Sequence, residues 1–226
     1  ALERIAPQSP AQASLAAHPA YVWDGLAARP VEAFAPAQYA LLTGIDEQKG
    51  RLLENTRRHA AGLPAHDVLL WGARGTGKSA SVGAVVGALQ RGGADLALMQ
   101  CAAGHLESLA ALFAVLRGVA RPFILFIDDL GFDEGNGGAG AGTGARALRS
   151  LLDGGASARP ANVRLYVTAN RRHIVPRNLS EQDDPINVRD VVDDKMALSD
   201  RFGLSLGFHV MDQDTYLAIV AGYARH

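Results

Sequence analysis

GARGTGKS, at residues 72–79, directly follows the apolar run VLLW of residues 68–71 and opens a stretch with helical periodicity that reaches Gln90. This spacing of glycines before a Lys-Ser pair, between a strand and a helix, is the Walker A pattern of a phosphate-binding loop. Glycines let successive backbone N–H groups point at phosphate oxygens, and the start of a helix adds a favourable dipole. The sequence therefore predicts a nucleotide-phosphate site at Gly72, Ala73, Arg74, Gly75, Thr76, Gly77, Lys78, Ser79 and Ala80.

Two side chains of this loop have expected chemical roles. Lys78 is one of only three lysines in a chain with many arginines. A compact ammonium fits between the β- and γ-phosphate oxygens, where a broad guanidinium does not. The hydroxyl of Ser79 stands where such loops bind Mg²⁺. We therefore expect Lys78 to act on the phosphates and Ser79 to bind the metal ion.

Short apolar segments alternate with helical ones from residue 66 onward. Strands that are apolar throughout and separated by helices indicate a parallel sheet covered on both faces. We therefore expect an α/β doubly wound fold with a parallel five-stranded sheet. The expected strands are 68–71, 96–101, 123–127, 163–168 and 204–209, and the expected helices are 46–61, 77–90, 106–117, 145–152, 188–198 and 212–224.

Two carboxylates follow the apolar run FILFI of residues 123–127. The carboxyl ends of parallel strands line the ligand crevice, so this pair resembles a Walker B element. Asp128 would then face the Mg²⁺ held at Ser79, and Asp129 would polarise the attacking water. The alternative is a polar pair that merely ends the strand. Many ATPases of this type have Glu at the second position, so the shorter Asp129 favours slow or partner-stimulated turnover.

Two later segments also carry candidate site residues. Thr168 or Asn170, at the end of the strand expected over 163–168, could hydrogen-bond the γ-phosphate or the attacking water, unless Asn170 only forms a turn. Arg201, in the run SDRFG of residues 199–203, could project toward a nucleotide on a neighbouring subunit and stabilise transition-state charge. It could equally be a salt-bridged surface residue, with Phe202 as the anchor.

These elements, in this order and after GID at residues 44–46, resemble an AAA+ ATPase. IDDL at 127–130 and SDRFG at 199–203 are similar to the replication-initiator and helicase-loader branch. GIDEQK at 44–49, LLDGG at 151–155 and residues 199–208 resemble an uncharacterised bacterial family described as a predicted ATPase. The resemblance covers about residue 41 to the C-terminus.

The resemblance implies Mg-ATP binding and hydrolysis, with ATP and Mg²⁺ as ligands. Lys78 and Asp129 would be catalytic, together with Asn170 as sensor 1 and Arg201 as arginine finger. Ser79 and Asp128 would hold the metal ion, and Gly44 and Ile45 would border the adenine. AAA+ ATPases commonly assemble into homo-oligomeric rings such as hexamers, and a ring would place the Arg201 of one subunit beside the nucleotide of the next. The chain would then remodel or load a protein or nucleic-acid partner.

The resemblance also implies an organisation of the chain into three parts. We expect residues 1–40 to be an N-terminal arm or the remnant of an N-terminal region, and residues 41–210 to form the AAA+ α/β domain. Residues 211–226 would begin a helical lid that is truncated or incomplete. Two stretches interrupt the rhythm of strands and helices: the glycine-rich residues 131–144 are expected to form a loop, and the polar residues 171–190 a surface excursion.

Composition excludes several other classes of protein. A formal net charge of -1 leaves no overall basic field for nucleic acid, and the single cysteine, Cys101, rules out an internal disulfide framework. No apolar run has the length of a membrane span, so we expect a cytoplasmic protein without a membrane contact. A small-molecule kinase would need an arginine-rich lid, and a GTPase an Asn-Lys-x-Asp run, and neither pattern is seen. A nucleotide-sensing module that hydrolyses little ATP remains the alternative to an active ATPase.

Overall fold

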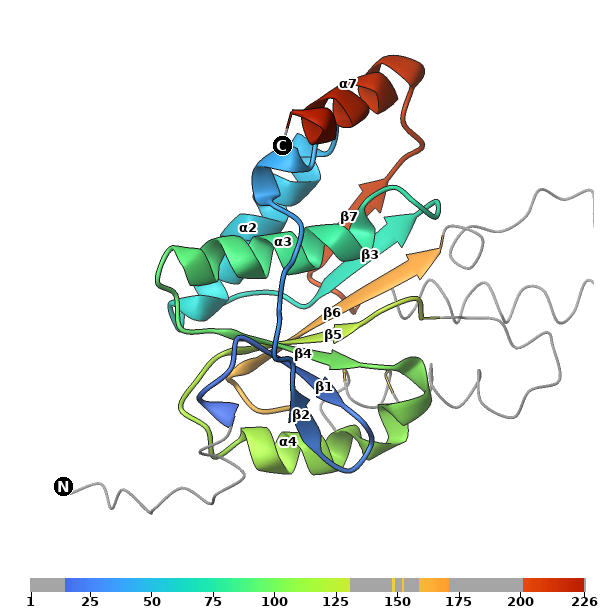
Figure 1. Ribbon diagram of the computed structural model, residues 1–226. Coiled ribbons are helices and arrows are strands. Elements are labelled where there is room, and N and C mark those ends of the chain that lie inside the picture. The colour runs from blue at the N-terminus through green and yellow to red at the C-terminus, as the bar shows by residue number, and fades with distance from the viewer. Residues whose placement is uncertain (1–14, 131–147, 149–151, 153–158, 171–200, 226) are drawn as a thin grey trace, which may run out of the picture.

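The computed structural model describes residues 15–130, 148, 152, 159–170 and 201–225. At its centre lies a seven-stranded sheet in the order β2-β1-β4-β5-β6-β3-β7 (Figure 1). All neighbouring strands are parallel except β1 and β2. The five predicted strands are all present, as β3 (Val68–Gly72), β4 (Ala97–Cys101), β5 (Phe123–Ile127), β6 (Val163–Asn170) and β7 (Leu204–Phe208). The α/β class with a mostly parallel sheet is confirmed.

The predicted number of five strands was too low, because β1 (Ala20–Trp23) and β2 (Ala28–Pro30) extend the sheet beyond β4. β1 runs parallel to β4 and turns back into β2 through a tight loop. In that loop the carboxylate of Asp24 accepts hydrogen bonds from the backbone N–H groups of Leu26 and Ala27, at 2.9 and 2.8 Å. The sheet therefore begins at Ala20, within the stretch expected to be an arm.

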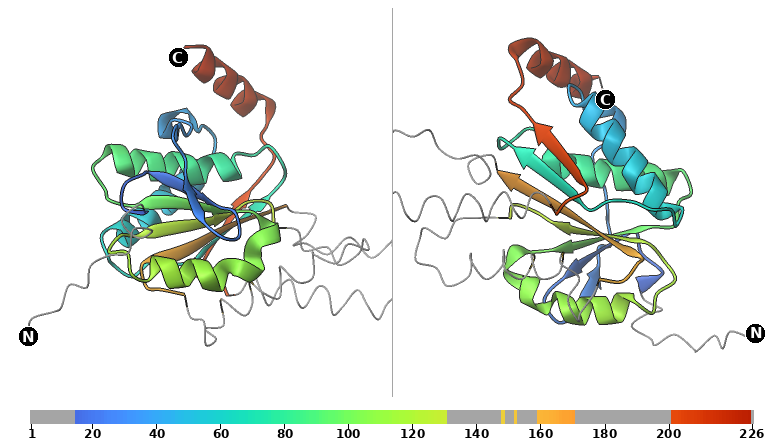
Figure 2. Two further views of the ribbon diagram at one scale, coloured as in Figure 1. Left: turned by 60° about the horizontal axis from the view of Figure 1, so that its bottom comes forward. Right: turned by 180° about the vertical axis from the view of Figure 1, so that it is seen from behind.

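Four helices accompany the sheet in the described residues: α2 (Asp46–Ala60), α3 (Lys78–Arg91), α4 (Leu109–Leu116) and α7 (Gln213–Ala224). Helices α2 and α3 cover one face of the sheet, and α4 covers the other (Figures 1 and 2). A 3-10 turn, η2 (Ala103–Ser108), leads into α4, and another, η1 (Tyr39–Leu41), lies close to α7. Among the described helices, none combines the length and the apolar character needed to cross a membrane.

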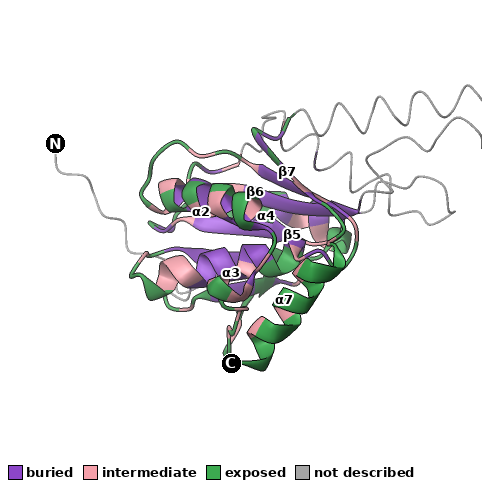
Figure 3. Ribbon diagram, turned by 90° about the horizontal axis from the view of Figure 1, so that it is seen from above, coloured by how far each residue is buried: buried purple, intermediate pink, exposed green. Residues whose placement is uncertain are grey.

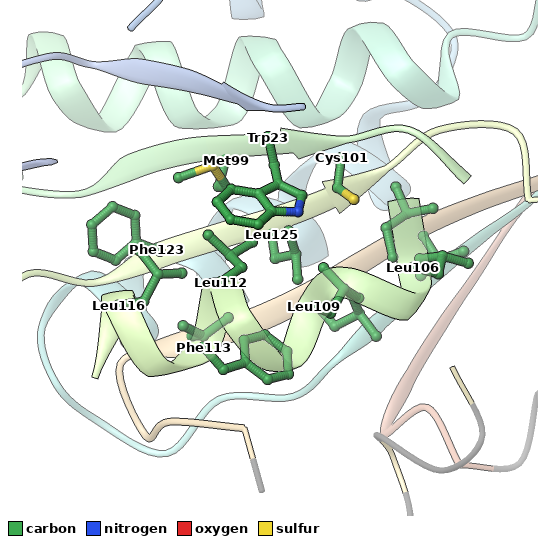
Figure 4. Packing of buried hydrophobic residues seen from close by; sticks show 14 of the residues in the cluster. Trp23, Met99, Cys101, Leu106, Leu109, Leu112, Phe113, Leu116, Phe123 and Leu125 are labelled. Atoms are coloured by element: carbon green, nitrogen blue, oxygen red, sulfur yellow. The ribbon is translucent and has the colours of Figure 1, made fainter. Parts of the chain in front are cut away.

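Strand β5 shows how one apolar run supplies two cores. Phe123, Leu125 and Ile127 pack on the α4 side of the sheet, and the alternate residues Ile124 and Phe126 pack on the side of α2 and α3. This alternation follows from the two-residue period of a strand. Figure 4 shows the α4 side, where Trp23 of β1 joins the leucines of η2 and α4. Burial on both faces explains why β5 contains no polar residue.

Helix α7 differs from the other helices in its burial. None of its residues is buried, whereas α2 and α3 present buried faces to the sheet (Figure 3). Its start is fixed by Asp212, whose carboxylate accepts a hydrogen bond from the backbone N–H of Thr215 at 2.8 Å.

The predictions for residues 131–144 and 171–198 lie outside the described residues. Of the helix predicted at 145–152 only Leu148 and Leu152 are described, and both pack in the α4-side core.

Candidate functional site

The loop that follows β3 has the backbone form that a phosphate-binding loop requires. Gly72, Gly75 and Gly77 have φ angles of 144°, 77° and 91°, in the region that glycine adopts most easily. A Cβ atom on Gly72 would lie 1.9 Å from the carbonyl oxygen of Phe208 in the neighbouring strand β7. Gly72 is therefore required by close packing as well as by its φ angle. Gly77 then caps α3, which begins at Lys78.

Lys78 is held inside this loop. Its ammonium donates hydrogen bonds to the carbonyl oxygens of Gly72 and Ala73, at 3.0 and 2.6 Å. The side chain is buried, and this burial lowers the pKa of Lys78 below its usual value. The negative charges of Asp129 and Asp128 oppose that shift. A cation is thus placed at the centre of the loop, within the electrostatic field of two carboxylates.

Asp128 connects the loop to the sheet. One of its oxygens, Oδ1, accepts hydrogen bonds from the hydroxyl of Ser79 and from the hydroxyl of Thr168, both at 2.6 Å. Ser79 belongs to α3, Asp128 follows β5, and Thr168 lies on β6, so three elements meet at this oxygen. The structure brings together the two residues predicted to bind Mg²⁺, and adds Thr168 as the buried group that orients the carboxylate.

Asp129 is held by three separate contacts. It has a φ angle of 52°, the only positive value for a non-glycine residue among those described, and its backbone N–H donates to Thr168 Oγ1 at 2.7 Å. Asn170 Nδ2 donates to its Oδ1 at 2.5 Å, and the guanidinium of Arg74 lies 3.2 Å from its Oδ2. Such conformations persist when surrounding contacts fix them, and they are common at functional sites. The pairing with Arg74 had no signal in the sequence.

Gly44 and Ile45 lie at the start of α2, beside the phosphate-binding loop. The side chain of Ile45 is buried, and its Cδ1 would be 3.4 Å from a Cβ placed on Gly77. On the other side, a Cβ on Gly44 would lie 2.4 Å from the methyl group of Thr215 in α7. This segment therefore joins the loop to α7, in a position that suits the expected contact with a base.

Arg201 does not join this cluster within its own chain. Strand β7 pairs with β3 so that Leu204 is opposite Val68 and Phe208 is opposite Gly72. Arg201 precedes Leu204, at the amino end of β7, whereas the phosphate-binding loop leaves the carboxyl end of β3. A strand rises about 3.3 Å per residue, so the four steps of β7 alone span about 13 Å. The exposed Arg201 thus lies beside the amino ends of the strands, whereas the loop lies at their carboxyl ends.

Comparison with solved structures identifies the architecture. The Holliday junction branch migration motor RuvB of Thermotoga maritima matches with a TM-score of 0.50 and 18% identity, over 85% of this chain and 54% of that one. A RuvB variant from the same organism, with one substitution, matches with a TM-score of 0.52 and 17% identity, again over 85% and 54%. The chain spans about half the length of these structures. At this level of identity the likeness shows a shared AAA+ P-loop fold.

Comparison of the sequence alone gives the family. No curated protein matches the chain. The model of a family described as "Protein of unknown function (DUF815)" matches residues 16–226, which is almost the whole chain. The protein is therefore a member of the DUF815 family, and its described part has the AAA+ P-loop fold.

Proposed function

We propose that the chain binds Mg-ATP and hydrolyses it as a subunit of an oligomeric AAA+ ATPase that remodels or loads a protein or nucleic-acid partner. One observation carries the proposal: polar groups at the carboxyl ends of β5 and β6 converge on the loop that follows β3. Ser79, Asp128, Asp129, Thr168 and Asn170 are linked there by hydrogen bonds of 2.5 to 2.7 Å. An ordinary glycine-rich turn would not need such a set.

The residues present fit ATP and Mg²⁺. The hydroxyl of Ser79 and the carboxylate of Asp128 share one hydrogen bond, and oxygen atoms of these two types are the ligands that Mg²⁺ prefers. When bound, the ion would neutralise charge on the β- and γ-phosphates. Lys78 would exchange its carbonyl contacts for phosphate oxygens, and the N–H groups at the start of α3 would donate to the same phosphates. Gly44 and Ile45 would border the adenine.

The hydrolytic step would use Asp129 and Asn170. A carboxylate oxygen of Asp129 would accept a hydrogen bond from water, and the water oxygen would then form a bond to the γ-phosphorus as the bond to the β–γ bridging oxygen breaks. The proton of the water would pass to the phosphate product, and ADP would leave. Asn170 keeps Asp129 in place through the contact at 2.5 Å. The shorter side chain of Asp predicts a low basal rate.

Arg201 would complete the site of a neighbouring subunit. Arg201 lies at the amino ends of the strands, away from the loop at their carboxyl ends, and this position favours the role over one in its own chain. Mixing two variants tests it: Lys78→Ala has a defective loop with an intact Arg201, and Arg201→Ala has an intact loop without the arginine. Each variant alone is expected to turn over ATP at least about tenfold more slowly than the wild type, since an arginine finger contributes 10³ or more in related sites.

In the mixture, Lys78→Ala subunits would donate Arg201 to the intact sites, and part of the activity would return. Light scattering with and without a slowly hydrolysed ATP analogue would show whether nucleotide drives the assembly. Arg201→Ala turning over ATP at the wild-type rate, or a mixture no more active than its two components alone, would contradict the shared site. Either result would leave the proposal of nucleotide binding at Lys78 standing.

One observation favours the second candidate, a nucleotide-sensing module with little hydrolysis. Both oxygens of Asp129 are engaged by donors of the same chain, Asn170 and Arg74. Turnover measured with excess Mg-ATP, alone and with single-stranded DNA or RNA, separates the two candidates. Binding without turnover under all three conditions would favour the sensing module.

A further inference from the structure

The two donors that hold the carboxylate of Asp129 differ in kind. Asn170 lies on β6, is buried, and contacts Oδ1 at 2.5 Å. Arg74 lies on the phosphate-binding loop and contacts Oδ2 at 3.2 Å, with 80% of its side chain exposed. The contact of Asn170 is thus fixed by the sheet, whereas that of Arg74 depends on a long side chain that can leave. Arg74 also lies only four residues before Lys78.

The carboxylate needs an available oxygen to act on water. Asn170 uses one hydrogen-bonding position of Oδ1, and the backbone N–H of Asp129 is bound to Thr168, so neither contact prevents water from reaching Oδ2. The guanidinium of Arg74 occupies that second oxygen. It also draws electron density from the carboxylate and competes sterically with a water at the same place. Of the three contacts, this one opposes the expected chemistry.

We propose that Arg74 is a positioning residue that restrains Asp129 and thereby lowers the basal rate of ATP hydrolysis. The inference rests on the proposed function and deepens it, because it assigns the low basal rate to a particular contact. The restraint is weak by nature, since an exposed ion pair changes an equilibrium by a factor of about two to five. It is also sensitive to salt, because exposed charges are screened.

The experiment measures kcat and KM for Mg-ATP in the wild type and in three variants of the full chain. Arg74→Ala removes the contact, and Arg74→Lys keeps a cation that can still pair with Asp129. Arg51→Ala is the matched control, because Arg51 is another exposed arginine, paired at 3.7 Å with Glu47 on α2. Nucleotide affinity is measured in parallel with a fluorescent ATP analogue, and thermal unfolding confirms that each variant folds.

We expect kcat of Arg74→Ala to rise about two- to fivefold, the factor that such an ion pair supplies, with KM and affinity changed by less than about twofold. Arg74→Lys keeps a cation beside Asp129 and should therefore raise kcat less than Arg74→Ala does, whereas the control Arg51→Ala should stay near the wild-type kcat. Raising the salt from about 0.05 to 0.5 M should increase the wild-type kcat toward that of Arg74→Ala, because the Debye length shortens. The variant itself should not respond in this way.

The opposite results overturn the inference. A lower kcat or a raised KM in Arg74→Ala would show that Arg74 acts on the phosphates, and unchanged constants would show that the contact has no kinetic effect. Binding of ATP without turnover in Arg74→Ala would equally contradict the restraint. Failure of all variants and of the wild type to bind nucleotide would contradict the proposed function itself, so the two failures are distinguishable.

Discussion

Replacing Thr168 by Val tests the arrangement of the two aspartates directly. Val has nearly the shape of Thr but lacks the hydroxyl, which donates to Asp128 Oδ1 at 2.6 Å and accepts from the N–H of Asp129 at 2.7 Å. Thr168 is buried, so water does not easily replace the lost partner. A hydrogen bond to a charged group contributes about 1.5–3 kcal/mol to stability. Because Asp129 is partly exposed and water can replace part of the lost contact, we expect a loss of about 2 kcal/mol.

For a domain of this size that loss corresponds to a Tm lower by about 4–8 °C. The functional effect should be larger than the effect on stability, because removing a group that orients a metal ligand typically weakens metal binding about 10–100-fold. The assay is the Mg²⁺ dependence of ATP turnover at fixed ATP, compared among wild type, Thr168→Val and Thr168→Ser. Thr168→Ser retains the hydroxyl and should remain within a few-fold of the wild type. Equal Mg²⁺ dependence in all three proteins would refute the assigned role of Thr168.

Three further predictions concern the scaffold around the site. Burial lowers the pKa of His59 to about 4, so the unfolded chain binds the proton first as the pH decreases. The free energy of unfolding should therefore fall by about 3 kcal/mol between about pH 6.5 and pH 4, and denaturant unfolding of His59→Gln should not show this dependence on pH. Gly72→Ala should abolish nucleotide binding and destabilise the fold by more than about 3 kcal/mol, because the added Cβ would lie 1.9 Å from the carbonyl oxygen of Phe208. A soluble Gly72→Ala variant that binds Mg-ATP normally would contradict this prediction. Tyr166→Phe removes a buried hydroxyl that lies 2.8 Å from the hydroxyl of Thr56 on α2, and should cost about 1–3 kcal/mol by urea unfolding while leaving the KM for ATP within about twofold.

The central strands could be predicted from the sequence because each is a continuous apolar run that the sheet buries on both faces. β1 and β2 could not, because they contain only four and three residues, and β2 consists of Ala, Arg and Pro. β1 pairs with β4, which lies more than 70 residues further along the chain. Such a short strand is stabilised by its tertiary partner, and a local pattern carries little information about it.

The candidate site shows a similar division. The convergence of Ser79 and Asp128 was predictable, because parallel strands place their carboxyl ends at one edge and the motif fixes the loop beside it. The contact between Arg74 and Asp129 was not, because it depends on the φ angle of 52° at Asp129 and on the path of a long exposed side chain. The role of Thr168 as a bridge between both aspartates likewise depends on strand register. The assignments of Asn170 as sensor 1 and of Arg201 as arginine finger remain predictions.

The most direct test of the central claim is the equilibrium binding of Mg-ATP, measured by titration calorimetry on the wild type and on Lys78→Ala. Lys78 is buried in the loop between two carbonyl contacts, so its loss removes the only ammonium that the described loop offers to phosphate. We predict saturable binding of one Mg-ATP per chain in the wild type, and affinity at least about tenfold weaker in Lys78→Ala, since losing one charge-assisted contact costs about 1.5–3 kcal/mol. Absence of binding in the wild type, or equal affinity in both proteins, would contradict the account.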